Sequence, residues 1–248
     1  MIKQFENFSS QSQFEPIESF YLQNDLNRKV WDKGDSINHE LRKELLKIAY
    51  DYLDFLDIDV DIEDIILTGS LANYNWSKYS DFDLHLVFDF TEVDENKELV
   101  KKYLDAAEKV WKFQHDLQLS GFPVELYCQD TDAEHTSTGV YSLVDDEWFK
   151  KPKKENFVPD EELIRVKSRK VMDSIKDLEY DLETNKNSNY ILKKLSKLWK
   201  RIKDARQAGL EKEGEFSIEN LIFKLLRRNG YIQRLLDVKK KAYDKQFK

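Results

Sequence analysis

Apolar residues recur at intervals of three and four along several stretches of the chain, a spacing that predicts amphipathic helices. Two such stretches lie before residue 120, one over residues 41–56 and one over 99–111. Shorter apolar runs between and after them predict the strands of a sheet. The predicted strands cover residues 65–67, 81–88, 124–128 and, more weakly, 139–144. The first 150 residues are therefore predicted to form a sheet with flanking helices.

From residue 151 onward only the helical spacing is found. We predict one helix that is capped by Asp160 and reaches about residue 182, and a second over residues 191–202. Ser217 is a suitable cap for a third helix, which Asn229 and Gly230 interrupt before a last helical stretch. The fold class predicted for the whole chain is α+β, with a mixed sheet followed by a C-terminal helical bundle.

The same pattern divides the chain into three parts. Residues 1–35 have weak periodicity and predict an irregular N-terminal arm with aromatic anchors such as Trp31. Residues 36–150 contain the predicted sheet, and residues 151–248 are predicted to form a separate helical domain. The boundary falls in the cationic run around Pro152, because proline restricts the residue before it and clustered charges resist burial.

The amino-acid composition is that of a folded globular protein and not of a membrane-spanning or disulfide-bonded one. The chain is 40% apolar, with 15 Phe, 12 Tyr and 5 Trp, which is enough to build a hydrophobic core. The single cysteine, Cys128, excludes an intrachain disulfide, and no stretch approaches the roughly 20 apolar residues of a membrane helix. The N-terminus also lacks the apolar core of a signal peptide. We therefore expect a folded cytoplasmic protein without a membrane partner.

The net charge of the chain is −8, but acidic and basic residues are distributed unevenly along it. Residues 1–150 contain 14 Lys and Arg against 32 Asp and Glu, whereas residues 151–248 contain 26 against 16. An acidic first part suits divalent cations, and a basic second part suits phosphate-rich partners. Solvated helix faces would produce the same counts, so both interpretations stay open at this point.

The residues that point to chemistry follow the first predicted strand and begin the second. Gly69 and Ser70 end the first strand where a helix is predicted to begin, and the free backbone N–H groups of such a junction favour phosphate. Glycine also permits a close approach of the ligand. Asp81 and Asp83 are two residues apart, so their side chains point to the same face of the second strand. Two carboxylates at this spacing can bridge a pair of Mg²⁺ ions.

Gly69-Ser70 followed by Asp81-x-Asp83 in an apolar setting resembles the signature of the DNA polymerase beta-like nucleotidyltransferase superfamily. The resemblance covers residues 64–130. It implies a mixed sheet with flanking helices, in which the Gly-Ser pair contacts a nucleoside triphosphate and the two aspartates hold the metals. A third acid from a later strand normally completes such a site. The candidate is Glu125, because its apolar neighbours on either side share the opposite face of the strand.

The implied function is a metal-dependent nucleotidyltransferase that moves a nucleoside monophosphate from a nucleoside triphosphate, such as ATP, to an acceptor hydroxyl and releases pyrophosphate. The resemblance implies two Mg²⁺ ions, with Mn²⁺ as a possible substitute. The basic second part favours a phosphate-bearing acceptor, RNA or another nucleotide, over a small alcohol or a protein hydroxyl. The expected metal ligands and catalytic residues are Asp81, Asp83 and Glu125, and the expected nucleotide contacts are Gly69, Ser70 and, more weakly, Ser80.

Two departures from the superfamily pattern keep other functions open. The segment after Ser70 has no basic residue before Lys78, and the third acid is Glu rather than the commoner Asp. The first departure favours a catalytically inactive nucleotide-binding regulatory module, whereas the presence of all three acids argues against it. A third hypothesis is an RNA-binding helical protein that works through residues 151–248, although this part contains no motif of sequence readout. His85 shares a strand face with Asp83 and is a candidate to border the site.

Overall fold

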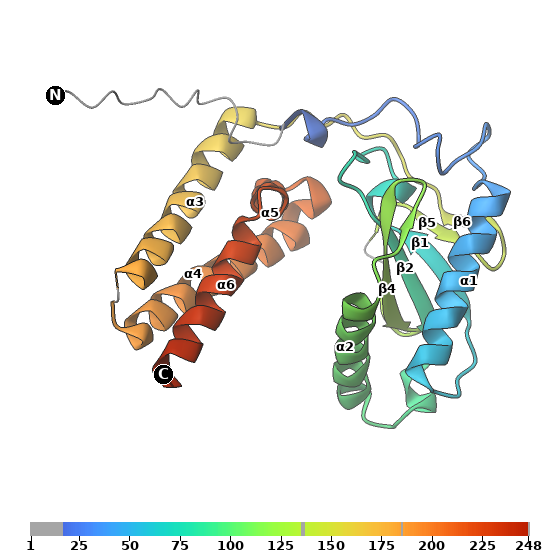
Figure 1. Ribbon diagram of the computed structural model, residues 1–248. Coiled ribbons are helices and arrows are strands. Elements are labelled where there is room, and N and C mark those ends of the chain that lie inside the picture. The colour runs from blue at the N-terminus through green and yellow to red at the C-terminus, as the bar shows by residue number, and fades with distance from the viewer. Residues whose placement is uncertain (1–16, 135–136, 185, 248) are drawn as a thin grey trace. The chain divides into compact units, whose positions relative to one another are not determined.

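The computed structural model describes residues 17–134, 137–184 and 186–247. The chain forms two compact units, one of Leu22–Asn156 and one of Met1–Tyr21 together with Phe157–Lys248 (Figure 1). The segment predicted as an N-terminal arm is thus divided between them, because residues 17–21 belong with the helices and the remainder from Leu22 belongs with the sheet. Residues 1–16 of that segment lie outside the described residues.

A six-stranded mixed sheet forms the centre of the first unit, with the strand order β3-β4-β2-β1-β5-β6. Strands β2 and β4 are parallel, and the other neighbouring strands are antiparallel. The strands are β1 (Asp64–Thr68), β2 (Phe82–Phe88), β3 (Gln118–Leu119), β4 (Phe122–Asp130), β5 (Val140–Ser142) and β6 (Glu147–Lys150). The four predicted strands are confirmed as β1, β2, β4 and β5, whereas β3 and β6 were not predicted.

Helices α1 (His39–Leu56) and α2 (Lys97–Gln114) pack against the sheet. Every second residue of the strands joins them in one hydrophobic core. Leu45 of α1 and Leu104 of α2 share this core with Leu84 and Leu86 of β2. Side chains alternate between the two faces of a strand, so the residues between these leucines point to the other face. That face of β2 and β4 carries the acidic residues described below. The short 3₁₀-helices of this unit are η2 (Ser70–Ala72) and η3 (Phe90–Glu92).

Trp31 anchors the segment that precedes α1. Its side chain is fully buried, and its ring stacks on Trp148 of β6 with 4.4 Å between ring centroids. The indole N–H donates a hydrogen bond of 2.7 Å to the backbone carbonyl of Leu71. Residues 22–38 form turns and one isolated bridge between Trp31 and Ile37, so this segment is irregular as predicted, and Trp31 anchors it in the core of the sheet unit.

The second unit is a bundle of four long helices (Figure 1). They are α3 (Glu161–Glu183), α4 (Ser188–Glu213), α5 (Ile218–Arg228) and α6 (Tyr231–Asp244), with the 3₁₀-helices η1 (Ile17–Phe20), η4 (Gly214–Phe216) and η5 (Lys245–Phe247). The predicted cap at Asp160 is confirmed, since its carboxylate accepts a hydrogen bond of 3.0 Å from the backbone N–H of Leu163. Ser217 occupies the cap position of α5, but its side chain makes no capping hydrogen bond. Among the described residues, no helix has the length and apolar composition that crossing a membrane requires.

Candidate functional site

Strands β2 and β4 bring three carboxylates together on one face of the sheet. The parallel pairing places the Cα of Asp83 opposite that of Glu125, and Asp81 directly precedes β2 on the same side. One carboxylate oxygen from each residue lies within 4.8 Å of the other two, and all three residues are half-buried. Three like charges this close repel one another strongly unless a cation is present. Carboxylate oxygens alone are also the donor set that Mg²⁺ and other hard divalent cations prefer.

Gly69 brings the backbone into direct contact with this cluster. Strand β1 pairs with β2 so that Thr68 lies opposite Asp83, and the chain leaves β1 at the next residue. Gly69 has φ 73° and ψ −159°, a conformation that is open almost only to glycine. A Cβ atom at this position would lie 1.8 Å from the Oδ2 atom of Asp83. The residue therefore has to be glycine for the carboxylate to occupy its place.

Ser70 and Ser80 form a hydroxyl pair beside the cluster. Their Oγ atoms are 2.7 Å apart, and the Oγ of Ser80 also accepts a hydrogen bond of 2.9 Å from the backbone N–H of Ser77. Ser80 is 3% exposed, so in this structure its hydroxyl supports Ser70 and the loop before Asp81. The contact of either serine with a nucleotide stays a prediction.

The helix predicted to begin after Ser70 is not formed. The chain makes only the 3₁₀ turn η2 and is extended at Asn73, which has φ −149° and ψ −178°. The indole N–H of Trp31 donates to the carbonyl of Leu71, which ties this stretch to the segment before α1. The carbonyl of Tyr74 likewise accepts a hydrogen bond of 2.7 Å from the N–H of Gln23. The prediction of an α-helix after Ser70 is therefore wrong, whereas the contact of Gly69 and Ser70 with phosphate stays a prediction.

Glu125 is held by two residues that the sequence analysis did not single out. Lys112 of α2 forms an ion pair with its Oε1 atom, and the Tyr127 hydroxyl donates a hydrogen bond of 2.6 Å to its Oε2 atom. Burial, followed by this hydrogen bond to the carboxylate, raises the pKa of Tyr127 well above its usual value, so the phenol stays a donor. The Lys112 side chain is 58% exposed, whereas that of Glu125 is 18% exposed, so the lysine approaches the carboxylate from the solvent side.

The period-two rule could have identified Tyr127, because it lies two residues beyond Glu125 on the same strand face. No such signal exists for Lys112, since its contact depends on how α2 packs against the sheet. His85 pairs with Tyr127 across the two strands, and their rings lie 5.2 Å apart. His85 therefore borders the residue that orients Glu125, in agreement with its predicted place on the Asp83 face.

The reactivity of the Cys128 thiol tests whether the helices cover its face of β4. It is partly buried with the helix-side core, and burial raises the pKa of its thiol to about 12. At pH 8 we therefore expect iodoacetamide to alkylate the native protein at least about 100-fold more slowly than the denatured chain, whose thiol pKa is about 8.5. The rate of carbamidomethylation, followed by mass spectrometry with and without guanidinium chloride, checks this expectation. Equal rates in the two states would place Cys128 on an open face and contradict the described packing.

No protein-family model, no curated protein and no solved structure matched the chain. The resemblance to the polymerase beta-like superfamily therefore rests on Gly69-Ser70 and on the three carboxylates.

Proposed function

We propose that the chain is a metal-dependent nucleotidyltransferase that transfers a nucleoside monophosphate from a nucleoside triphosphate to an acceptor hydroxyl. The observation that carries the proposal is the convergence of the Asp81, Asp83 and Glu125 carboxylates within 4.8 Å. The conformation of Gly69 adds support, because the absence of a side chain there leaves room for the Asp83 carboxylate directly beside the backbone.

In this proposal Asp81 and Asp83 would hold divalent cations, Mg²⁺ or Mn²⁺. Such ions, when bound, lower the pKa of the attacking hydroxyl and neutralise the charge of the leaving pyrophosphate. The protein itself positions the carboxylates through the β2–β4 register and pairs the Ser70 hydroxyl with that of Ser80, the residue before Asp81. Its contribution is chiefly orientation, as is general for phosphoryl transfer.

Glu125 differs from the two aspartates in its partners and therefore in its proposed role. The Tyr127 hydroxyl donates a hydrogen bond to Oε2 of Glu125, and the Lys112 ammonium forms an ion pair with Oε1. A bound divalent cation would take the place of Lys112 in this proposal. A carboxylate that is oriented in this way can complete the ligand set and accept the proton of the acceptor hydroxyl. The acceptor that we propose carries phosphate, as RNA or a nucleotide does.

The transfer is tested by incubating the full chain with each of the four ribonucleoside triphosphates, Mg²⁺ or Mn²⁺, and total RNA or small-molecule extract as acceptors. We expect metal-dependent release of pyrophosphate and transfer of an α-phosphate label to the acceptor. A γ-phosphate label serves as the control, because it should appear only in pyrophosphate and never in the product. A label transferred from the γ position would identify a kinase, and the absence of pyrophosphate with every nucleotide and acceptor would contradict the proposal.

A non-catalytic nucleotide-binding module is the second candidate, and one contact favours it. Lys112 already neutralises Glu125, so the third acid is paired without any metal. Calorimetric binding of a nucleoside triphosphate to the full chain, combined with no turnover under the conditions above, would support this module over the enzyme.

A further inference from the structure

A cationic groove lies between α3 and α4 of the helical unit, in residues that the acidic cluster does not use. It has a volume of about 870 Å³, with Ser174, Asp177 and Leu178 of α3 on one side and Lys197 and Arg201 of α4 on the other. A second hollow of about 320 Å³ adjoins it at Arg201, extends along α3 to Lys170 and is closed on its third side by α5.

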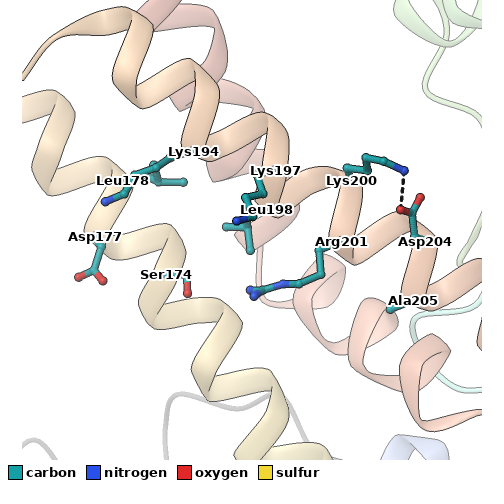
Figure 2. Close-up of a pocket in the computed structure, with 10 residues that line it drawn as sticks. All are labelled: Ser174, Asp177, Leu178, Lys194, Lys197, Leu198, Lys200, Arg201, Asp204 and Ala205. Atoms are coloured by element: carbon teal, nitrogen blue, oxygen red, sulfur yellow. Dashed lines mark hydrogen bonds and ion pairs between the residues drawn. The ribbon is translucent and has the colours of Figure 1, made fainter.

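Three cations of this groove lack an acidic partner. Lys170, Lys197 and Arg201 are exposed, and within the described part of the chain none of them forms an ion pair with a carboxylate. Figure 2 shows the side chains of Lys197 and Arg201 directed from α4 toward α3, whereas Lys200 turns toward Asp204. The remaining cations of the groove are paired, Lys194 with Asp181 at 3.4 Å, Lys200 with Asp204 at 2.7 Å and Lys167 with Glu219 at 3.3 Å.

The unpaired charges follow the helix axis. Lys197 and Arg201 are four residues apart, which places them on one face of α4 about one turn, or roughly 5.4 Å, apart. Lys170 lies on α3 and extends the cationic surface beyond Arg201, which lines both hollows. A linear polyanion can contact all three of these cations at once, whereas a single small anion can contact only one or two of them.

The lining beneath these cations is apolar. In the first hollow Leu178 is 3% exposed and Leu198 is 7% exposed, so a partner cannot bury much more of either side chain. In the second hollow Val171, Ile222 and Phe223 are half-buried and can still contact a partner. The three cations without acidic partners favour a ligand that carries phosphates, and an acidic polypeptide is the competing ligand in the test.

We propose that this groove binds the phosphate backbone of a single-stranded nucleic acid. The first hollow has a volume of only about 870 Å³, which is too small to take in both strands of a duplex, whereas the backbone of one strand can follow it. The excess of 26 Lys and Arg over 16 Asp and Glu in residues 151–248 attracts such a polyanion at longer range. This binding activity goes beyond the proposed transfer and does not depend on it.

The test uses the full chain in EDTA, without nucleotide, and a fluorescein-labelled oligouridine of about 15 nucleotides. Anisotropy titrations at several NaCl concentrations should give a logarithmic salt slope of about −2, from roughly 0.7 for each of three neutralised phosphates. The triple variant K170Q/K197Q/R201Q should bind at least about tenfold more weakly at low salt, with a slope closer to zero. All three side chains are exposed, so circular dichroism is expected to show an unchanged fold.

The matched control is K239Q/K240Q/K241Q, which removes the same charge from exposed positions of α6 outside the groove. It should bind within about threefold of the natural chain. An equal loss in both triple variants would assign the binding to net charge and overturn the groove. Displacement of the RNA by polyglutamate of equal charge would identify an acidic polypeptide as the better ligand, and no binding by the natural chain would also overturn the proposal. Because the assay contains no metal, a failure of nucleotide transfer leaves its outcome unaffected.

Discussion

Replacement of Asp83 by asparagine is expected to abolish nucleotide transfer and, at the same time, to stabilise the metal-free protein. Two unit charges about 4 Å apart repel by about 4 kcal/mol at an effective dielectric constant near 20, and the nearby Lys112 offsets part of this. Asn keeps the size of Asp and removes one of three mutually repelling charges. We expect a gain of about 1 kcal/mol in the free energy of unfolding, or a few degrees in Tm, when no divalent cation is present.

The same substitution should remove the response of the protein to metal. A cation that binds only the folded state raises its stability in proportion to the logarithm of metal concentration over Kd, so MgCl₂ should raise the Tm of the natural chain. This rise should be largely lost in Asp83→Asn, together with at least about a thousandfold of the transfer rate, because metal clamps supply several kcal/mol of transition-state stabilisation. Differential scanning fluorimetry with MgCl₂ or EDTA measures the first effect, and pyrophosphate release measures the second.

Asp51→Asn is the matched control for this experiment. Asp51 lies on the exposed side of α1 and pairs only with Lys47 in the hydrogen bonds and ion pairs described for it. Its replacement removes one negative charge from the same unit without touching the cluster, so the metal-dependent Tm rise and the transfer rate should both stay within about twofold. An Asp83→Asn protein that keeps the full metal response would show that the three carboxylates do not form the metal site.

The period of two along the strands was sufficient to predict which acids share a face. Asp81 and Asp83 lie on one face of β2 because they are two residues apart, and Glu125 lies opposite the apolar residues of β4 for the same reason. The parallel register that sets Asp83 beside Glu125 is a long-range feature, and no local pattern encodes it. The sequence thus predicted the members of the cluster, whereas the pairing of the strands determines how close they are.

The errors of the sequence analysis have a common physical origin in contacts between distant segments. The residues after Ser70 are held by distant segments, since Trp31, about 40 residues earlier, donates to the carbonyl of Leu71 and Gln23 donates to that of Tyr74. Strand β6 was missed because Trp148 is ordered by stacking on the same Trp31. Lys112 could not be assigned to the site because its position depends on the packing of α2.

Gly69→Ala is expected to destabilise the protein and also to disable the site, through two separable effects. Alanine at φ 73° and ψ −159° adopts a conformation that costs of order 1–3 kcal/mol. In addition, its Cβ would lie 1.8 Å from Oδ2 of Asp83, so the carboxylate or the backbone has to move. A displacement of about 1 Å in a catalytic group can reduce the rate about a hundredfold, and we expect a loss of at least this size in transfer.

Gly214→Ala separates the two effects because it reproduces the backbone strain without the clash. Gly214 has φ 68° and ψ −154°, nearly the same conformation as Gly69, and a Cβ added there would meet no atom within 4 Å. We expect Gly214→Ala to lose a similar 1–3 kcal/mol in urea or thermal unfolding and to keep its transfer rate and its metal-dependent Tm rise. If Gly69→Ala loses only stability, as Gly214→Ala does, the glycine is needed for the turn alone. A combined loss of stability, metal response and transfer in Gly69→Ala would mean that the position of the Asp83 carboxylate depends on the hydrogen atom that glycine has in place of a side chain.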